Sequence, residues 1–305
     1  MEFSVHNRCN KAAGPLMPFD FPAIYKLAGD LAASSQSRYF RLLKAEYGLL
    51  ITASVLSLGF STSKVYFLFS VLVFFLSLAC MLFRMWDKPE QDWYKGRALA
   101  ESVKTSCWRY CMRAEPFFHS SDISIPREGF REHLLGIFRS NRNIGHKFSP
   151  SIGVDHAATG SMDSVRLSDL HARKNYYLKL RIEDQEEWYL RKAKHNRRAS
   201  FAWGVIGASV YALAIILSMF KLAFYENFFY PMPVLVALAT SIVGWAQIKK
   251  FNELASSYTL TAYEIGLIKN KINEVESEES FSDFVNESEQ AFSREHTQWV
   301  ARQFS

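Results

Sequence analysis

The chain has 305 residues, 49% of them hydrophobic, and a formal net charge of +6 at pH 7. This length allows two modest domains, but four apolar stretches without formal charge use much of the hydrophobic content and exclude a large water-soluble core. The basic excess indicates charge beside a membrane surface and anionic headgroups, and it argues against nucleic-acid binding.

The chain begins with a polar segment, residues 1–34, and no secretory signal is expected because the first apolar run starts too late. That run, Tyr47–Phe60, is separated from the second, Val65–Phe83, by only four residues. A helix needs about 20 apolar residues to cross a hydrocarbon core, and uninterrupted apolarity favours helices over a β-barrel. The two stretches therefore predict a transmembrane hairpin.

Tyr47–Phe60 is the shorter stretch of the pair and contains Gly48 and Gly59. If only its neighbour crossed the membrane, the chain would continue on the wrong side, so both stretches are expected to span. An alternative stays open, in which Tyr47–Phe60 lies flat as an interfacial helix.

After this hairpin, Asp92–Met112 has apolar side chains at spacings of three and four, which predicts a helix. Cys107 and Cys111 share one of its faces, and without a second cysteine pair or a histidine at ligand spacing they are interpreted as packed thiols. Arg127–Ser140 predicts a short amphipathic helix. Residues 141–164, rich in Gly, Ser, Asn and Pro, predict a linker.

The second half follows the same order. A long charged helix is expected from Ser168 into the third apolar stretch, Phe201–Phe220, because neither Pro nor Gly stops it before the stretch begins. The fourth stretch is Phe228–Ile248, so the two together predict a second transmembrane hairpin. Phe251–Ile272 predicts the helix that follows it.

A last helix is expected near the end of the chain, where Ser280 and Asp283 have the spacing of a capping box. Its apolar stripe needs a partner surface, for which the other cytoplasmic helices are the simplest choice. The stripe consists of Phe281, Phe284, Val285, Phe292 and Trp299.

A short motif of Tyr, an apolar residue, Arg, two residues and Lys precedes each hairpin, at Tyr39–Lys44 and Tyr189–Lys194. This echo supports a tandem repeat of helix, hairpin and helix. The expected organisation is a polar segment (1–34), a first unit (35–140), the linker (141–164) and a second unit (165–305).

Lysine and arginine residues next to the apolar stretches predict the orientation, because basic residues tend to stay cytoplasmic. The two tight connections contain only Lys64 and Lys221, whereas the other flanks are strongly basic. Both termini and the middle segment are therefore expected in the cytoplasm. The basic flanks contain Arg38, Arg41, Lys44, Arg84, Lys88, Arg191, Lys192, Lys194, Arg197, Arg198, Lys249 and Lys250.

Motifs for catalysis or cofactor binding are not found: the sequence has no Gly-rich phosphate loop, HExxH or GxSxG. We therefore expect neither enzymatic activity nor a cofactor nor a metal. The apolar stretches also contain no ionisable residue, which argues against ion-coupled transport or voltage sensing. Their hydroxyl side chains are the candidates for lining a pore: Thr52, Ser54, Ser57, Ser209, Ser218, Thr240 and Ser241.

Two constellations of aromatic and charged residues in the cytoplasmic helices are candidates for ligand binding or gating. The alternative interpretation is that they are interfacial anchors and ion pairs between helices just outside the membrane. They consist of Trp93, Arg97, Glu101, Lys104 and Trp108, and of Arg181, Asp184, Gln185 and Trp188.

A ridge of small residues at steps of four, Gly204, Ala208 and Ala212, lies in the third apolar stretch. Small residues let another helix approach closely in a membrane. The ridge is therefore predicted either to pack the third span on the fourth or to form an interface between subunits.

Three motifs resemble the SLATT family, bacterial two-transmembrane effector domains associated with SMODS and SLOG sensor systems. The first is Asp92–Lys104 with Trp108–Tyr110 and Glu115–Phe117. The second is Tyr177–Tyr189, and the third is the tail Phe281–Arg302. Together they cover nearly the whole chain from about Arg38 as two tandem units.

The resemblance implies a bacterial inner-membrane effector of antiphage or conflict defence that oligomerises and permeabilises the membrane. Unlike fused members of that family, this chain is expected to carry no attached sensor domain. A nucleotide second messenger or a sensor protein is therefore expected as a separate trigger.

The expected fold class is an all-α membrane protein with two transmembrane helical hairpins, four spans in total, and long cytoplasmic helices. The leading functional hypothesis is a homo-oligomeric, gated and poorly selective pore. The alternative is a membrane scaffold that recruits a cytoplasmic signalling partner without conducting.

Overall fold

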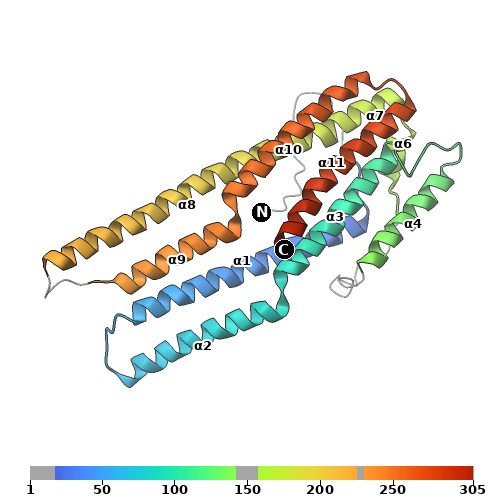
Figure 1. The fold of residues 1–305 in the computed structure, drawn as a ribbon. Helices are drawn as coiled ribbons and strands as arrows, with labels where there is room; N and C mark the ends of the chain where they lie inside the picture. Colours follow the sequence, from blue (N-terminus) through green and yellow to red (C-terminus); the bar gives the residue numbers. More distant parts are fainter. Residues whose placement is uncertain (1–17, 142–156, 225–229, 305) are drawn as a thin grey trace. The chain divides into compact units, whose positions relative to one another are not determined.

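The computed structural model describes residues 18–141, 157–224 and 230–304, and every element in these ranges is a helix (Figure 1). The all-α class is therefore confirmed for the described residues. In chain order the elements are α1 (Ala23–Leu56), α2 (Lys64–Asp87), α3 (Pro89–Cys111), α4 (Ser124–Ser140), α6 (Gly160–Leu167), α7 (Leu170–Tyr177), η1 (Leu178–Glu183), α8 (Asp184–Ala223), α9 (Met232–Lys249), α10 (Phe251–Lys271), η2 (Ile272–Glu274) and α11 (Glu278–Phe304).

The helices form two compact units, and each unit draws on separate stretches of the chain. Unit 1 consists of Met1–Ser37, Pro89–Tyr189 and Leu260–Ser305, and unit 2 consists of Arg38–Lys88 and Leu190–Thr259. Helices α1, α8 and α10 have residues in both units. The residues that pack together in each compact unit therefore come from both halves of the sequence.

The expected division of the sequence at 35–140 and 165–305 stays a prediction. Residues 1–17 of the expected N-terminal segment lie outside the described residues, as does most of the expected linker. Within that linker, residues 160–164 are helical and belong to α6, because Thr159 caps the helix by accepting a hydrogen bond from the backbone N–H of Met162.

Unit 1 has an interior of aromatic residues beside a close contact between two helices. The rings of Phe19 and Tyr177 lie 4.8 and 5.6 Å from the ring of Trp108, which is 3% exposed. Where α1 meets α3, a Cβ on Gly96 would lie only 3.0 Å from the backbone nitrogen of Ala32. Glycine is thus required at this crossing.

The long charged helix of the second half is confirmed, with one irregularity. Helical backbone is continuous from Leu170 to Ala223, but Leu178–Glu183 forms a π-helix, η1. Such π-helical segments are rare and occur often at functional sites. The helix expected over Phe251–Ile272 is also found, as α10.

The predicted cap of the last helix is wrong. Helix α11 begins at Glu278, and its first turn is closed by Ser277 and Ser280 rather than by Ser280 and Asp283. The backbone N–H of Ser280 donates to the Ser277 hydroxyl, and the backbone N–H of Ser277 donates to the Ser280 hydroxyl, both at 3.1 Å. The reciprocal arrangement of a capping box is therefore present three residues earlier, with serine in place of a carboxylate.

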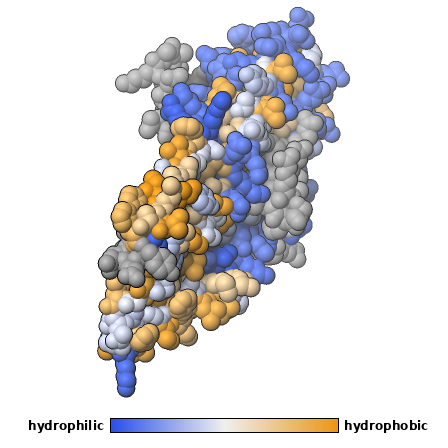
Figure 2. All heavy atoms as spheres, turned by 60° about the vertical axis from the view of Figure 1, so that its left-hand side comes forward, coloured by the Kyte–Doolittle hydropathy of each residue, from blue (hydrophilic) through white to orange (hydrophobic). Residues whose placement is uncertain are grey.

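Unit 2 has an apolar outer surface. The segments Lys64–Cys111, Leu170–Ala223 and Met232–Glu274 contain helices that are long and apolar enough to cross a membrane. Side chains such as Phe75, Phe201 and Ile215 are 65, 76 and 61% exposed, and Figure 2 shows hydrophobic side chains gathered over the surface that unit 2 forms. Water does not favour such a surface, which indicates membrane association.

The first apolar stretch is not among these three helices. Helix α1 ends at Leu56, and Gly59 follows in the left-handed region with φ of 72°. Whether Tyr47–Phe60 spans or lies at the interface therefore stays a prediction.

Helices α1 and α2 lie side by side within unit 2 (Figure 1). The guanidinium of Arg84 donates to both carboxylate oxygens of Glu46, at 2.8 and 3.2 Å. Arg38 pairs with Asp87 at 3.0 Å. The hydroxyl of Tyr66 donates to the carbonyl of Leu56. Polar contacts thus join the two helices at both ends, with apolar sequence between them.

Candidate functional site

The polar core cluster of unit 1, defined as Thr105, Tyr177, Arg181 and Glu289, surrounds a buried ion pair. The Nε and Nη2 groups of Arg181 donate to Oε1 and Oε2 of Glu289 at 2.8 and 2.7 Å. The two side chains are only 2 and 0% exposed. This is the bidentate geometry in which a guanidinium and a carboxylate interact most strongly.

Two hydroxyl groups complete the surroundings of the carboxylate. The hydroxyl of Tyr177 donates to Oε1 of Glu289 at 3.0 Å, and that of Thr105 donates to Oε2 at 2.9 Å. The ring of Phe292 lies 4.9 Å from the guanidinium carbon of Arg181. Each carboxylate oxygen therefore accepts two hydrogen bonds, which offsets part of the cost of burying the charge.

Three separate segments supply this cluster. Thr105 comes from α3, Tyr177 and Arg181 from the end of α7 and from η1, and Glu289 from α11. Because a buried pair is costly to separate, it ties the three segments of unit 1 to one relative arrangement. A rearrangement of these helices would have to break or move the pair.

The buried pair also determines the protonation of its neighbours. Burial lowers the pKa of Arg181, but the Glu289 carboxylate raises it, and the net pKa lies above the ordinary value. Burial and the same carboxylate raise the pKa of Tyr177 well above its usual range. Burial and the nearby Arg181 lower the pKa of Lys104. The Arg181 guanidinium therefore stays charged at neutral pH, while the Tyr177 phenol stays neutral.

The structure brings together charged residues from the two predicted constellations. The net pKa of Lys104 is lowered, and four charged residues act on its ammonium group. Arg181 lowers this pKa further, whereas Glu101, Asp184 and Glu289 oppose the lowering. Tyr25 of α1 also lies in this region, and burial together with Glu101 raises its pKa to about 12. Charges that the sequence predicts as two sets thus form one electrostatic neighbourhood.

Each of the aromatic members of those constellations contacts another ring. Trp108 is buried against Phe19 and Tyr177, beside the polar core cluster. Trp93 stacks on Tyr94 and Trp188 contacts Tyr189 edge-on, each pair with ring centroids 4.9 Å apart. Arg97 is buried and Gln185 is half-buried. Their predicted roles in ligand binding or gating stay predictions.

The sequence prediction missed Glu289, Tyr177 and Thr105 as site residues. A signal for the glutamate is present: Phe281, Val285 and Glu289 follow one another at steps of four on α11. Such residues share a helix face. Since the first two are buried, a charged residue that continues the row is expected to be buried and paired as well.

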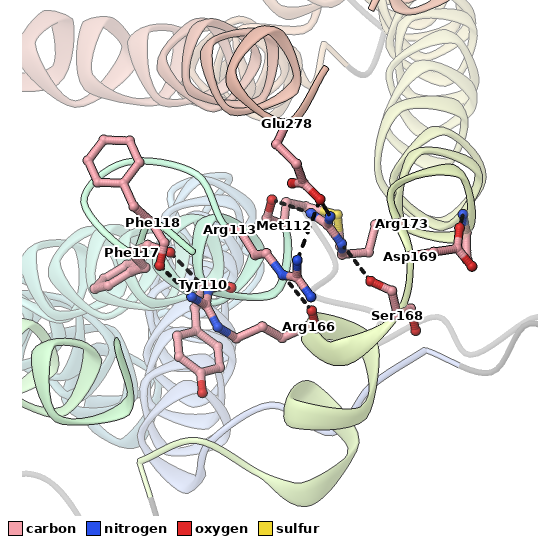
Figure 3. Close-up of polar contacts among 11 residues, drawn as sticks. Tyr110, Met112, Arg113, Phe117, Phe118, Arg166, Ser168, Asp169, Arg173 and Glu278 are labelled. Atoms are coloured by element: carbon pink, nitrogen blue, oxygen red, sulfur yellow. Dashed lines mark hydrogen bonds and ion pairs between the residues drawn. The ribbon is translucent and has the colours of Figure 1, made fainter. Parts of the chain in front are cut away.

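A second group, the arginine cluster of Arg113, Arg166 and Arg173, lies at the end of α3 (Figure 3). Arg166 donates to the backbone carbonyls of Tyr110, Phe117 and Phe118 at 2.5, 3.0 and 2.7 Å. Burial lowers its pKa to about 10. One of these carbonyls belongs to the last turn of α3, and the other two belong to the segment between α3 and α4.

The other two arginines share one carboxylate. Arg173 donates to the carbonyls of Met112 and Ser168 at 3.0 and 3.1 Å and also to the carboxylate of Glu278. Arg113 donates to the carbonyl of Arg166 at 2.8 Å and to Glu278 at 3.4 Å (Figure 3). Because carbonyl oxygens and Glu278 take up so many donors, the cluster is best understood as a clamp between helices.

The predicted pore-lining hydroxyls of unit 2 are mostly bonded within their own helices. Thr52, Ser54, Ser57, Ser209, Ser218 and Thr240 each donate to a carbonyl three or four residues earlier, at 2.7–2.9 Å. Ser218 also lies 2.8 Å from the hydroxyl of Tyr230. Ser241 is half-buried. Their lining of a pore therefore stays a prediction.

The small-residue ridge of α8 is exposed. Gly204, Ala208 and Ala212 are all accessible, and a Cβ on Gly204 would meet nothing within 4 Å. Gly207 is buried instead, and a Cβ there would lie 3.5 Å from Cγ2 of Ile242 on α9. Of the two interpretations of the ridge, packing on the fourth stretch is thus not what the structure contains, and the subunit interface stays a prediction.

Comparison with known families gives two matches that follow one another along the chain. Residues 22–174 match the SMODS and SLOG-associating 2TM effector domain 3, and residues 177–299 match the SMODS and SLOG-associating 2TM effector domain 1. No match was found among curated proteins or among solved structures.

Proposed function

This chain belongs to the SMODS and SLOG-associating 2TM effector (SLATT) family, with two such domains in tandem, and from that premise we propose that it is a pore-forming membrane effector. The family is associated with conflict and defence systems. In this proposal the chain resides in the bacterial inner membrane and permeabilises it in antiphage defence. Both termini and the middle segment face the cytoplasm.

The observation that carries this proposal is the apolar surface of unit 2. Long runs of α2 and α8 expose aromatic and aliphatic side chains, among them Phe74, Phe75 and Phe201 at 61, 65 and 76%. Lipid tails are the environment in which such a surface is stable. We propose that α1 with α2 and α8 with α9 form two transmembrane hairpins, which gives four spans.

Assembly into a pore is supported by the exposed ridge of Gly204, Ala208 and Ala212. Within one chain Gly207 makes the close contact to α9, so the ridge is available to a helix of a second copy. The four apolar stretches contain no Asp, Glu, Lys, Arg or His, and a pore that they line would discriminate little between ions.

Gating is assigned to unit 1 in this proposal. The buried Arg181–Glu289 pair holds α3, η1 and α11 together. A nucleotide second messenger or a sensor protein would supply the free energy to rearrange these helices. The chain itself is proposed to have no enzymatic activity.

A second candidate function, a non-conducting scaffold that recruits a cytoplasmic partner, is favoured by one observation. The hydroxyls proposed to line the pore already donate to carbonyls of their own helices. They therefore have no need of water or of a polar partner, and the spans would be equally stable in a helix bundle without a conducting path.

Liposomes test the proposal and separate the two candidates. We expect full-length protein reconstituted into dye-filled vesicles to release the dye after activation. Gly204→Leu with Ala208→Leu should abolish release while leaving the protein in the vesicles, and Gly129→Ala on α4 serves as a control substitution. Retention of dye with every candidate trigger, by protein that floats with the vesicles, would support the scaffold.

A further inference from the structure

A cluster of cations and aromatic rings lies in unit 2, apart from the residues discussed above. This interfacial cluster consists of Phe40, Lys44, Trp203, Trp245 and Lys249. The ammonium nitrogen of Lys249 lies 3.6 Å from the ring centre of Phe40 and 5.1 Å from that of Trp245. That of Lys44 lies 5.8 Å from the ring centre of Trp245.

The rings are themselves packed together. The ring centres of Phe40 and Trp203 lie 5.7 and 6.3 Å from that of Trp245. Three helices, α1, α8 and α9, contribute these side chains. Both ammonium groups are thus within 6 Å of one indole ring, where the ring faces attract cations and the two like charges repel each other.

The described carboxylates of unit 2 are engaged elsewhere. Glu46 pairs with Arg84 at 2.8 Å, and Asp87 pairs with Arg38 at 3.0 Å. Glu253 lies 4.0 Å from Lys250. Lys44 makes no ion pair with any described residue. An anion that compensates the charge of Lys44 is therefore most simply supplied from outside the chain.

Other basic residues of unit 2 increase this imbalance. They are exposed and make no ion pair among the described residues: Arg41, Lys88, Arg197 and Arg198. A surface with this excess of positive charge favours an anionic partner with several negative groups in one plane, which a layer of acidic phospholipid provides.

The cluster also lies where a headgroup would be found. Lys44 is three residues before the first apolar stretch, which starts at Tyr47, and Lys249 directly follows the fourth, which ends at Ile248. Tryptophan is enriched at the level of the headgroups, and lysine side chains near helix ends extend towards them.

We propose that the interfacial cluster is a binding site for the phosphate of an anionic phospholipid headgroup. Lys44 and Lys249 donate hydrogen bonds to the phosphate oxygens, and Trp203 and Trp245 flank the site at the boundary with the acyl chains. This inference rests on the proposed placement of unit 2 in a bilayer, and it adds a ligand class and its residues.

Native mass spectrometry of the full-length protein in detergent tests the site without a bilayer or a pore. The delipidated protein is titrated with phosphatidylglycerol and, separately, with phosphatidylcholine of the same acyl chains. We expect a preference for phosphatidylglycerol that falls by about 30-fold in Lys44→Gln with Lys249→Gln, since each lysine near an anionic surface contributes roughly 1 kcal/mol.

Two matched variants complete the design. Lys64→Gln with Lys221→Gln removes the same charge at the opposite ends of the apolar helices and should keep the preference. Lys44→Arg with Lys249→Arg retains the charge and should also keep it, and circular dichroism of each variant checks its fold. Equal binding of the two lipids, or equal losses in both glutamine variants, would overturn the proposal.

A further arm distinguishes the source of the phosphate. Inorganic phosphate and glycerol phosphate are added to the lipid-bound protein at increasing concentration. If lipid stays bound when the soluble phosphate is in thousandfold excess over the lipid, the headgroup site is supported. Complete displacement of the lipid would mean that the cluster binds soluble phosphate and would overturn the lipid assignment. Because dye release is not measured here, failure of this test and failure of the proposed pore are separate outcomes.

Discussion

The two units place the same types of aromatic residue in opposite positions. In unit 1, Trp108, Tyr110 and Phe130 are 3, 0 and 0% exposed. In unit 2, Phe74 and Phe75 are 61 and 65% exposed. Burying an aromatic side chain from water stabilises a fold, so a unit that turns these rings outward is built for a different solvent. The difference indicates that unit 2 associates with a membrane.

Ion pairs follow the same division. The Arg181–Glu289 pair of unit 1 is 2 and 0% exposed, whereas the Arg38–Asp87 pair of unit 2 is 50 and 21% exposed. Unit 1 thus places charge inside and apolar residues around it, and unit 2 keeps its charges towards the ends of its apolar helices. Four experiments test this comparison, beginning with the largest expected effect.

Glu289→Gln should destabilise unit 1 by about 3–5 kcal/mol, because it leaves the Arg181 charge buried and uncompensated. Urea unfolding of the detergent-solubilised protein, followed by tryptophan fluorescence, measures this change. The control Glu287→Gln disrupts the exposed pair with Lys271 and should change stability by about 0–1 kcal/mol.

Replacing both partners sharpens the test. Arg181→Met with Glu289→Met removes the two charges together and should recover most of the stability that Glu289→Gln loses. If the double variant is as unstable as the single one, the loss comes from packing or from the hydroxyl groups rather than from the unpaired charge.

Phe75→Arg should impair membrane insertion, since an arginine at the centre of a span costs about 2.5–3.5 kcal/mol on insertion scales. Fractionation of cells that express the protein measures the share that remains in the membrane. Phe118 of unit 1 is 57% exposed and apolar too, so Phe118→Arg is the matched control that should leave insertion unchanged. If both substitutions reduce the share of protein in the membrane equally, unit 2 does not differ from unit 1 in its contact with lipid.

Gly96→Ala should cost about 1–3 kcal/mol, because its Cβ would meet backbone atoms of Ala28 and Ala32 at 3.0–3.3 Å. Gly129→Ala on α4 has open space around its Cβ and should stabilise by about 0.5–1 kcal/mol. Thermal unfolding of both variants checks the opposite signs. A stabilising Gly96→Ala would contradict the close crossing of α1 and α3.

The smallest effect is expected at His133, whose Nε2 lies 3.1 Å from the Ser106 hydroxyl. Burial and the nearby Arg109 lower its pKa. Below about pH 6.5 the unfolded chain therefore binds the proton more readily, and stability falls until the pH passes the lower pKa of the folded state. The Tm difference between pH 7.5 and 5.5 should shrink in His133→Gln, and an unchanged difference would exclude this histidine as the source.

Periodicity and composition predicted much of the helical framework. Val65–Phe83, Phe201–Phe220 and Phe251–Ile272 all lie within helices, because long apolar or amphipathic runs without proline specify a helix locally. Helix ends were less predictable: α11 starts at Glu278 through a serine cap, and α1 ends at Leu56. Caps depend on single hydrogen bonds, which composition does not record.

The candidate site was predicted only in part. Arg181, Lys104 and Glu101 were expected from their local density of charge. The association of Lys104 with Arg181, however, joins residues 77 positions apart, and the partner Glu289 lies 108 positions after Arg181. A single sequence contains no pairing information of that kind. The ridge at Gly204 shows the same limit: spacing predicted a helix-packing face there, but the structure leaves Gly204 open and places Gly207 against α9.

The central claim, that the apolar helices of unit 2 cross a bilayer, is tested most directly by labelling the connection between α1 and α2. Thr62→Cys is expressed in bacterial cells and treated with a membrane-impermeant maleimide, with the unmodified protein as the background control. Labelling above that of the unmodified protein is predicted from the periplasmic side of intact inner membranes and not from the cytoplasmic side of inverted vesicles. Labelling only from the cytoplasmic side would contradict the hairpin, the orientation and the proposed pore together.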